Sequence, residues 1–216
     1  MNAIETFIQS SQNFVIKQKK EWIEIFSGIE TKNKYSVLDD QMSEIGFIIE
    51  EGRGFIHFIK RWLLRSHRPF NISVLDKEGH LILRLKRKFF WFFSDLHISF
   101  DEKTYGSIHR RFSIFFKHYD VKDSSGNFIF KIRSPFWRIW TFPAKNKNGN
   151  QIGLVTKKWQ GLLKEAFTDS DAFMIKADAN LSAENKILLF CCGISIDFDY
   201  FENNQGSRSL FDFVGN

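Results

Sequence analysis

The chain has 216 residues, of which 43% are hydrophobic and 26% are charged. This balance excludes an intrinsically disordered chain and is sufficient for a substantial core, in one large domain or two small ones. The only two cysteines are the neighbours Cys191 and Cys192, which excludes a disulfide framework of the kind found in small secreted proteins.

The formal net charge is +6, and it is unevenly distributed. Residues 51–120 contain 14 Lys and Arg against 7 Asp and Glu, a net charge of +7. Such a concentration favours an anionic partner, either a lipid surface or a nucleic acid. The alternative is a solubilising surface.

Residues 1–13 have neither the basic start nor the long apolar centre of a signal peptide. We therefore interpret them as an N-terminal tail and expect the protein to stay inside the cell that makes it.

Short apolar runs separated by turn residues follow, a pattern typical of β-strands. The runs at 70–76 and 81–88 predict a hairpin. In the second run leucines alternate with Arg84, Lys86 and Lys88, so these three cations should share the outward face of the strand. Five further runs have strand patterns: 35–38, 44–50, 113–123, 128–133 and 148–159.

In the run at 128–133, Lys131 and Arg133 should point outward, opposite to the apolar residues. Strands this short, with turns every roughly 8 to 12 residues, favour a sandwich or a barrel. The segment 52–70 departs from this pattern, because its apolar residues have helical spacing. Phe58 and Trp62 are four residues apart with basic residues between them. The segment is therefore both basic and aromatic, whether it forms a helix or a loop.

Residues 187–196 are an uninterrupted run of ten apolar or small residues, followed by Asp197 and Asp199. As a helix the run would be about 15 Å long, half of the roughly 30 Å that a bilayer core requires. Apolar residues occupy all of its sides, which predicts a core helix surrounded by protein. A second short helix is predicted at 161–167.

Residues 152–177, IGLVTKKWQGLLKEAFTDSDAFMIKA, and the helix after them resemble the phospholipid scramblase family. That family has a similar G-x-V-x-x-x-W-x-G-x-x-x-E-A-F-T-D-x-D segment and then a hydrophobic helix containing I-D-F. The matching residues here are Gly153, Val155, Trp159, Gly161, Glu165, Ala166, Phe167, Thr168, Asp169, Asp171, Ile196, Asp197 and Phe198. The resemblance extends over roughly residues 14–202.

The resemblance implies a fold akin to the tubby C-terminal domain, in which a closed barrel of twelve antiparallel strands surrounds a central hydrophobic helix. We accordingly expect a mainly β domain at 14–202, followed by a flexible tail at 203–216. The chain departs from animal members in lacking their cysteine clusters, which are palmitoylation sites.

The resemblance also implies phospholipid binding and passive movement of phospholipids between bilayer leaflets. Such movement consumes no chemical energy, and the sequence has neither a P-loop nor a G-x-S-x-G motif, so we expect a lipid-binding protein rather than an enzyme. The residues expected to contact lipid are Lys60, Arg61, Trp62, Arg68, Arg84, Lys86, Lys88, Lys131 and Arg133.

A proposed calcium segment of the family matches residues 169–180. An EF-hand loop requires oxygen ligands at positions 1, 3, 5 and 12, with glycine at position 6. Asp169 and Asp171 fit positions 1 and 3, but Phe173, Met174 and Asn180 occupy the other three. We therefore expect no cofactor requirement and at most weak Ca²⁺ binding at Asp169 and Asp171.

A nucleic-acid or protein-binding module is the alternative function. Aromatic and basic residues interleave at 84–93 and 109–118 and could stack on bases. However, strand alternation would place many of these aromatics in the core, and no nucleic-acid-binding motif accompanies them. We therefore favour an anionic phospholipid surface as the partner, at the cytoplasmic face of the plasma membrane, and leave the oligomeric state open.

Overall fold

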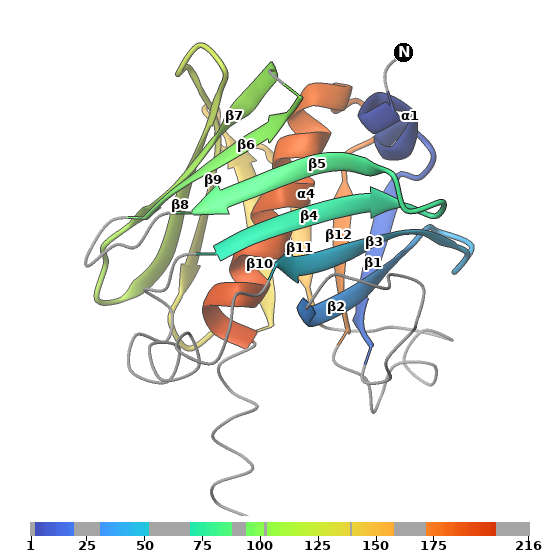
Figure 1. Ribbon diagram of the computed structural model, residues 1–216. Helices are drawn as coiled ribbons and strands as arrows, with labels where there is room; N and C mark the ends of the chain where they lie inside the picture. Colours follow the sequence, from blue (N-terminus) through green and yellow to red (C-terminus); the bar gives the residue numbers. More distant parts are fainter. Residues whose placement is uncertain are drawn as a thin grey trace, which may run out of the picture.

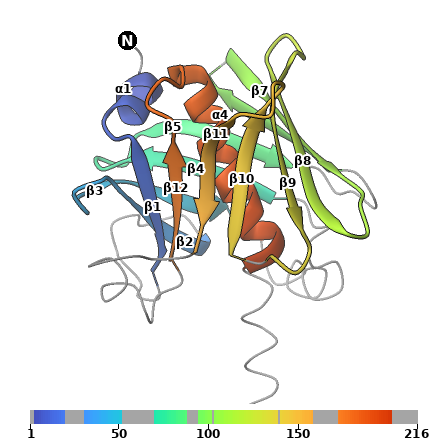
Figure 2. The same ribbon diagram turned by 180° about the vertical axis from the view of Figure 1, so that it is seen from behind.

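The computed structural model describes residues 3–19, 31–51, 70–87, 94–101, 103–138, 140–157 and 172–201. These residues form a closed antiparallel barrel of twelve strands around the helix α4 (Ala183–Ile196), as Figures 1 and 2 show from opposite sides. The predicted mainly β architecture, with a closed barrel around a C-terminal helix, is therefore confirmed.

Strands β2 to β12 follow one another around the barrel in chain order, and β1 closes it by pairing with both β2 and β12. Closure leaves none of the described strands with an open edge for pairing with another chain. The strands are β1 (Asn13–Gln18), β2 (Thr31–Leu38), β3 (Glu44–Glu51), β4 (Phe70–Asp76), β5 (Leu81–Arg87), β6 (Ser94–Phe100), β7 (Lys103–Arg111), β8 (Phe116–Asp123), β9 (Phe128–Pro135), β10 (Thr141–Asn146), β11 (Gln151–Thr156) and β12 (Ala172–Ala177).

Helix α4 fills the interior of the barrel. Ser182 caps it by accepting a hydrogen bond from the backbone N–H of Asn185, and every residue from Ile187 to Ile196 is buried. A π-helical turn, η2 (Asp197–Phe201), continues it. Within the described residues, no helix has both the length and the apolar composition that crossing a membrane requires. The prediction of a core helix surrounded by protein is confirmed.

Two glycines allow α4 to lie directly against the barrel wall. A Cβ atom at Gly153 of β11 would be 2.4 Å from Cδ2 of Leu189, and one at Gly193 of α4 would be 2.5 Å from Cδ1 of Ile175. Both distances are too short for a side chain. This close contact gives a physical reason for glycine at the first position of the segment that begins at Gly153.

The first residues of the chain include a helix that we did not predict from the sequence. In α1 (Ala3–Gln9), the side chains of Ile4, Phe7 and Ile8 are buried. The ring of Phe7 packs edge-on against Phe190 of α4, with 5.8 Å between centroids. The domain boundary at residue 14 stays a prediction, but α1, which precedes it, packs into the core. The i, i+3, i+4 spacing of Ile4, Phe7 and Ile8 could have indicated this helix.

The two ends of the barrel differ. Helix α1 lies at one end, and α4 finishes at the other (Figures 1 and 2). We call the second end the exit end. The loops after β7 and β9 lie there, because residues beside them contact the turn η2 that follows α4: Tyr119 and Arg110 reach Asp199, and Lys117 reaches Tyr200.

Candidate functional site

Two neighbouring loops at the exit end expose large apolar side chains. Loop 112–115 joins β7 to β8, loop 136–140 joins β9 to β10, and the Phe136 N–H donates to the Phe115 carbonyl oxygen at 2.9 Å. Of the seven large apolar side chains that are exposed in the described part of the chain, six belong to these loops. They are Phe112, Ile114, Phe115, Phe136, Trp137 and Trp140, between 45% and 72% exposed.

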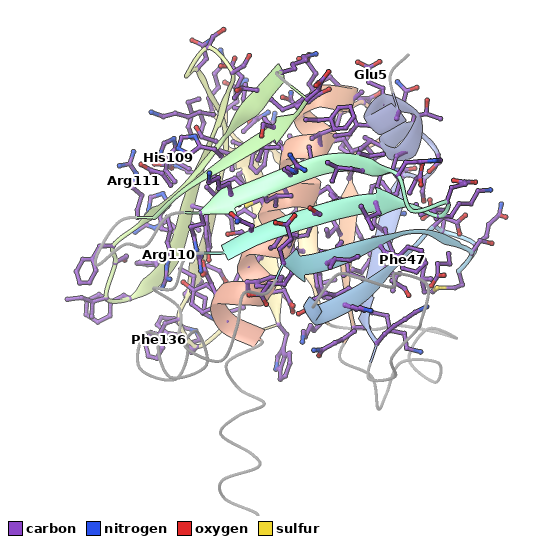
Figure 3. The ribbon with its side chains drawn as sticks, viewed as in Figure 1. Glu5, Phe47, His109, Arg110, Arg111 and Phe136 are labelled. Atoms are coloured by element: carbon purple, nitrogen blue, oxygen red, sulfur yellow. The ribbon has the colours of Figure 1, made fainter. Side chains whose placement is uncertain are left out.

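We call these six side chains the apolar rim. Figure 3 shows Phe136 at the opposite end of the molecule from Glu5 in α1. The loops satisfy part of their own backbone: Ser113 Oγ accepts from the Phe116 N–H, and the Arg138 N–H donates to the Pro135 carbonyl. Exposed apolar side chains gathered on neighbouring loops are typical of an interaction surface.

Cations border the apolar rim. Arg111, Arg133 and Arg138 are exposed. The Arg133 guanidinium lies over the ring of Phe116, 4.0 Å from its centroid, and Arg111 Nε donates to Asp120 at 2.9 Å. Exposed apolar side chains and positively charged side chains therefore lie next to each other at the exit end.

Beneath the rim, a buried polar cluster attaches the end of α4 to the barrel wall. Asp199 accepts hydrogen bonds from Arg87 at 2.5 Å and from the Tyr119 hydroxyl at 2.7 Å. Arg110 lies 3.7 Å from the same carboxylate. Burial, together with the negative charge of Asp199, raises the pKa of Tyr119 well above its ordinary value, so this hydroxyl stays a donor.

The structure separates the predicted lipid-contacting cations into two sets. Arg84 and Lys86 are exposed on β5, as predicted, and line an open pocket of about 310 Å³. Lys131 and Arg133 are exposed on β9, but β6, β7 and β8 lie between β5 and β9. The two pairs therefore do not form one continuous patch.

Several predicted residues lie outside the described residues, and their predicted roles stay predictions. They are Lys60, Arg61, Trp62, Arg68 and Lys88 for lipid contact, and Asp169 and Asp171 for Ca²⁺.

One group of potential metal ligands is close together in the described residues. Ligand atoms of Asp76, Glu78 and His80, in the β4–β5 turn, lie within 4.8 Å of one another. Asp76 Oδ1 already accepts a hydrogen bond from the backbone N–H of His80 at 2.8 Å. The position of the Asp76 carboxylate is therefore explained by its role in the turn.

The family model "Scramblase" matches residues 1–203. The chain belongs to the scramblase family. A phospholipid scramblase family protein of Schizosaccharomyces pombe is 23% identical over 97% of this chain and 65% of its own length. Altered inheritance rate of mitochondria protein 25 of Saccharomyces cerevisiae is 25% identical, over 96% of this chain and 76% of its own.

Animal relatives are similar to the same extent. Phospholipid scramblase 4 of Homo sapiens is 25% identical over 94% of this chain and 65% of its own length. The chain therefore spans about two thirds of these relatives. No solved structure matches it.

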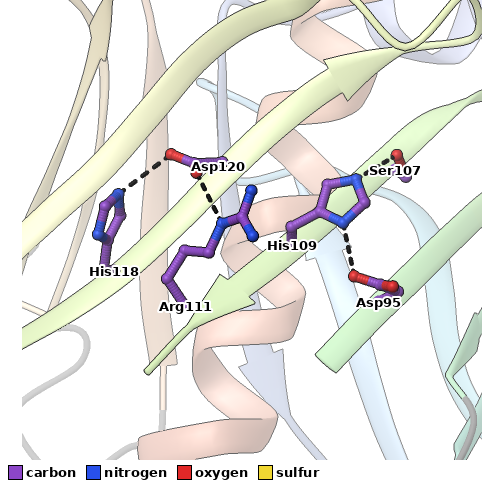
Figure 4. Close-up of polar contacts among 6 residues, drawn as sticks. All are labelled: Asp95, Ser107, His109, Arg111, His118 and Asp120. Atoms are coloured by element: carbon purple, nitrogen blue, oxygen red, sulfur yellow. Dashed lines mark hydrogen bonds and ion pairs between the residues drawn. The ribbon is translucent and has the colours of Figure 1, made fainter. Parts of the chain in front are cut away.

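The outer face of this scramblase-family barrel also carries a serine, a histidine and an aspartate in contact (Figure 4). His109 lies 2.9 Å from Ser107 Oγ and 2.5 Å from Asp95. An acyl-transfer site also needs N–H donors free to hold a developing oxyanion. Ser107 is in the middle of β7 and pairs on both sides, with His97 and Lys122, so we interpret the contacts as outward strand packing.

Sequence reasoning missed the apolar rim. The interleaved segment 109–118 was the signal, but continued strand alternation would have turned many of its aromatics inward. That expectation is wrong for Phe112 and Phe115, each 61% exposed, because β7 ends at Arg111 and β8 begins at Phe116. Asp199 was likewise not singled out, although it holds the buried cluster together.

Proposed function

We propose that this scramblase-family protein associates peripherally with anionic phospholipid membranes through the apolar rim, and that it assists passive movement of phospholipids between leaflets. The observation that supports membrane association is the gathering of six exposed apolar side chains on two adjoining loops, bordered by Arg111, Arg133 and Arg138. The support for lipid movement is family membership.

The chemistry of the rim suits the boundary between lipid tails and headgroups. Tryptophan and other aromatic side chains favour this boundary, where an apolar ring and a polar group can both be satisfied. Cations at the base of the rim would lie at headgroup depth, where each contributes about 1 kcal/mol near an anionic surface. In this orientation the exit end faces the bilayer while α4 stays enclosed.

The proposed location is the cytoplasmic face of the plasma membrane. Because one relative is named for the inheritance of mitochondria, mitochondrial lipid is the second composition to test. Lipid movement is proposed from the names of the scramblase relatives, and it needs no nucleotide or catalytic group.

Vesicle sedimentation with a matched pair of variants tests the proposal. Wild type, the double variant Phe115→Ser and Trp137→Ser, and the control Phe128→Ser are each mixed with vesicles of phosphatidylcholine, alone or with phosphatidylserine or cardiolipin. Phe128 is an exposed apolar residue at the other end of β9. We expect wild type and control to sediment with anionic vesicles and the rim variant to stay in solution at an unchanged thermal midpoint.

Two results would redirect the proposal. If the rim variant sediments like wild type, the rim is not the membrane contact. If wild type ignores every vesicle but retards a single-stranded oligonucleotide, and the rim variant does not, the alternative nucleic-acid function is favoured. Lipid movement is measured separately, by dithionite quenching of fluorescent lipid in reconstituted vesicles.

A further inference from the structure

Lys117 is a buried cation that the proposed function has not yet used. It is the second residue of β8, directly beside loop 112–115, and is only 8% exposed. Its side chain points inward, as those of Tyr119 and Val121 do. Its ammonium lies 4.7 Å from the ring centroid of Tyr200 and 5.0 Å from that of Phe142.

The surroundings of this ammonium supply little negative charge. Its hydrogen-bond acceptor is the Arg138 carbonyl, at 3.5 Å, in loop 136–140. Within the described part of the chain, no carboxylate oxygen lies within 4.0 Å of Lys117 Nζ. An ammonium has three donors, so ring faces and one distant carbonyl leave most of its capacity to bond an anion unused.

Neighbouring charges add to this imbalance. Arg110 also lies over the ring of Tyr200, at 5.3 Å, and shares Asp199 with Arg87. One carboxylate thus faces two guanidinium groups, with a third cation, Lys117, beside them. Among the described residues this buried cation has no carboxylate partner, which is unfavourable, and burial lowers the pKa of Lys117.

We propose that Lys117 binds the phosphate of one phospholipid headgroup, held between the two loops of the apolar rim. This inference rests on the proposed function, since the rim is what brings headgroups to this depth. The Lys117 ammonium contacts loop 136–140 through the Arg138 carbonyl, and Lys117 is two residues beyond the end of loop 112–115. A phosphate there would therefore lie next to the inserted side chains.

Binding of a soluble lipid to the full chain tests the site without a membrane. Dihexanoyl phosphatidic acid, used below its micelle concentration, is titrated calorimetrically into wild type, Lys117→Met, Lys117→Arg and Lys145→Met. Lys145 is an exposed lysine on strand β10 that has no proposed lipid contact, and it is the control. Loss of one charge-assisted hydrogen bond should weaken binding about tenfold or more in Lys117→Met. Lys117→Arg and Lys145→Met should bind like wild type.

The rim variant Phe115→Ser and Trp137→Ser separates this inference from the proposed function. It should lose vesicle binding but still bind the soluble lipid, because it keeps Lys117. Wild-type affinity in Lys117→Met would overturn the inference even if vesicle binding by the rim is verified. Inorganic phosphate that binds as tightly as the soluble lipid would overturn the assignment to a lipid.

The thermal midpoint of Lys117→Met shows whether this variant folds. Methionine replaces a buried cation that has no carboxylate partner in the described part of the chain by an apolar group of similar length, so the midpoint should stay equal or rise. If Lys117→Met does not fold, Lys117→Gln, which keeps polarity without charge, decides the question by the same titration.

Discussion

Arg87, the last residue of β5, donates a hydrogen bond to Asp199 across 2.5 Å, although 112 residues separate them in the sequence. Both side chains are almost completely buried, and Tyr119 donates to the second carboxylate oxygen. This contact fixes the last turn of the core helix to the barrel wall, directly beneath the surface that we propose for membrane contact.

Replacement of Asp199 by alanine should lower the free energy of unfolding by about 3 to 5 kcal/mol, because it leaves a buried guanidinium without its partner. Urea unfolding followed by far-UV circular dichroism measures the change. The control is Asp95→Ala, which removes a partly exposed contact with His109 and should cost about 1 kcal/mol or less. Equal effects of the two substitutions would show that the Arg87–Asp199 contact is not structurally important.

The strands and the core helix could be predicted from local patterns. In β5, Leu83 and Leu85 are buried while Arg84 and Lys86 are exposed, as alternation indicates. The helix was predictable because ten apolar residues are too few to cross a bilayer and too apolar for a surface. Closure by pairing of β1 with both β2 and β12 depends on distant contacts, and was anticipated only through the family resemblance.

The site was less predictable, because its parts come together from distant segments. Nothing near Asp199 in the sequence indicates Arg87, and nothing near Lys117 indicates that Tyr200 and Phe142 enclose it. The exposure of Phe112 and Phe115 depends on where β7 stops, and strand boundaries are the least certain part of a sequence prediction.

The predicted basic face of β5 and the apolar rim should respond differently to salt. Reversal of Arg84 and Lys86 to glutamate removes long-range attraction, so sedimentation with anionic vesicles should weaken at low ionic strength with an unchanged thermal midpoint. At about 1 M salt the Debye length is roughly 3 Å, and the difference from wild type should largely disappear. The rim variant should bind poorly at every salt concentration. If both variants depended on salt equally, this would contradict the view that Arg84 and Lys86 attract the protein to the membrane while the apolar rim inserts into it.

Removal of Ca²⁺ should leave the fold unchanged. In the segment 169–180, Phe173 at EF-hand position 5 offers no side-chain oxygen, and Asn180 at position 12 cannot supply the bidentate carboxylate. Phe173 is also buried within β12, so any binding should be weak. Thermal unfolding with excess chelator or with millimolar Ca²⁺ should give the same midpoint. Submicromolar affinity in calorimetry, abolished by Asp169→Ala, would prove this expectation wrong.

Phosphate binding at Lys117 should fail at a lower pH than binding to an ordinary lysine. Burial lowers the pKa of Lys117 below 10.5, and only its protonated form carries the charge that attracts phosphate. Affinity for dihexanoyl phosphatidic acid should therefore fall as the pH rises through this lowered pKa. Lys117→Arg should keep its affinity at this higher pH, because arginine stays protonated. The nearby Tyr200 hydroxyl should also stay neutral, because burial raises its pKa.

The same shift predicts the sign of a stability change. Between the lowered pKa of folded Lys117 and the ordinary value of 10.5 in the unfolded chain, the unfolded state binds more protons. The contribution of Lys117 to the free energy of unfolding therefore increases with pH across this window, and this increase should be missing in Lys117→Met. Urea titrations of both proteins at a series of alkaline pH values measure it. Parallel pH profiles would show that Lys117 is not held as a buried, uncompensated cation, and would remove the physical basis for a phosphate site there.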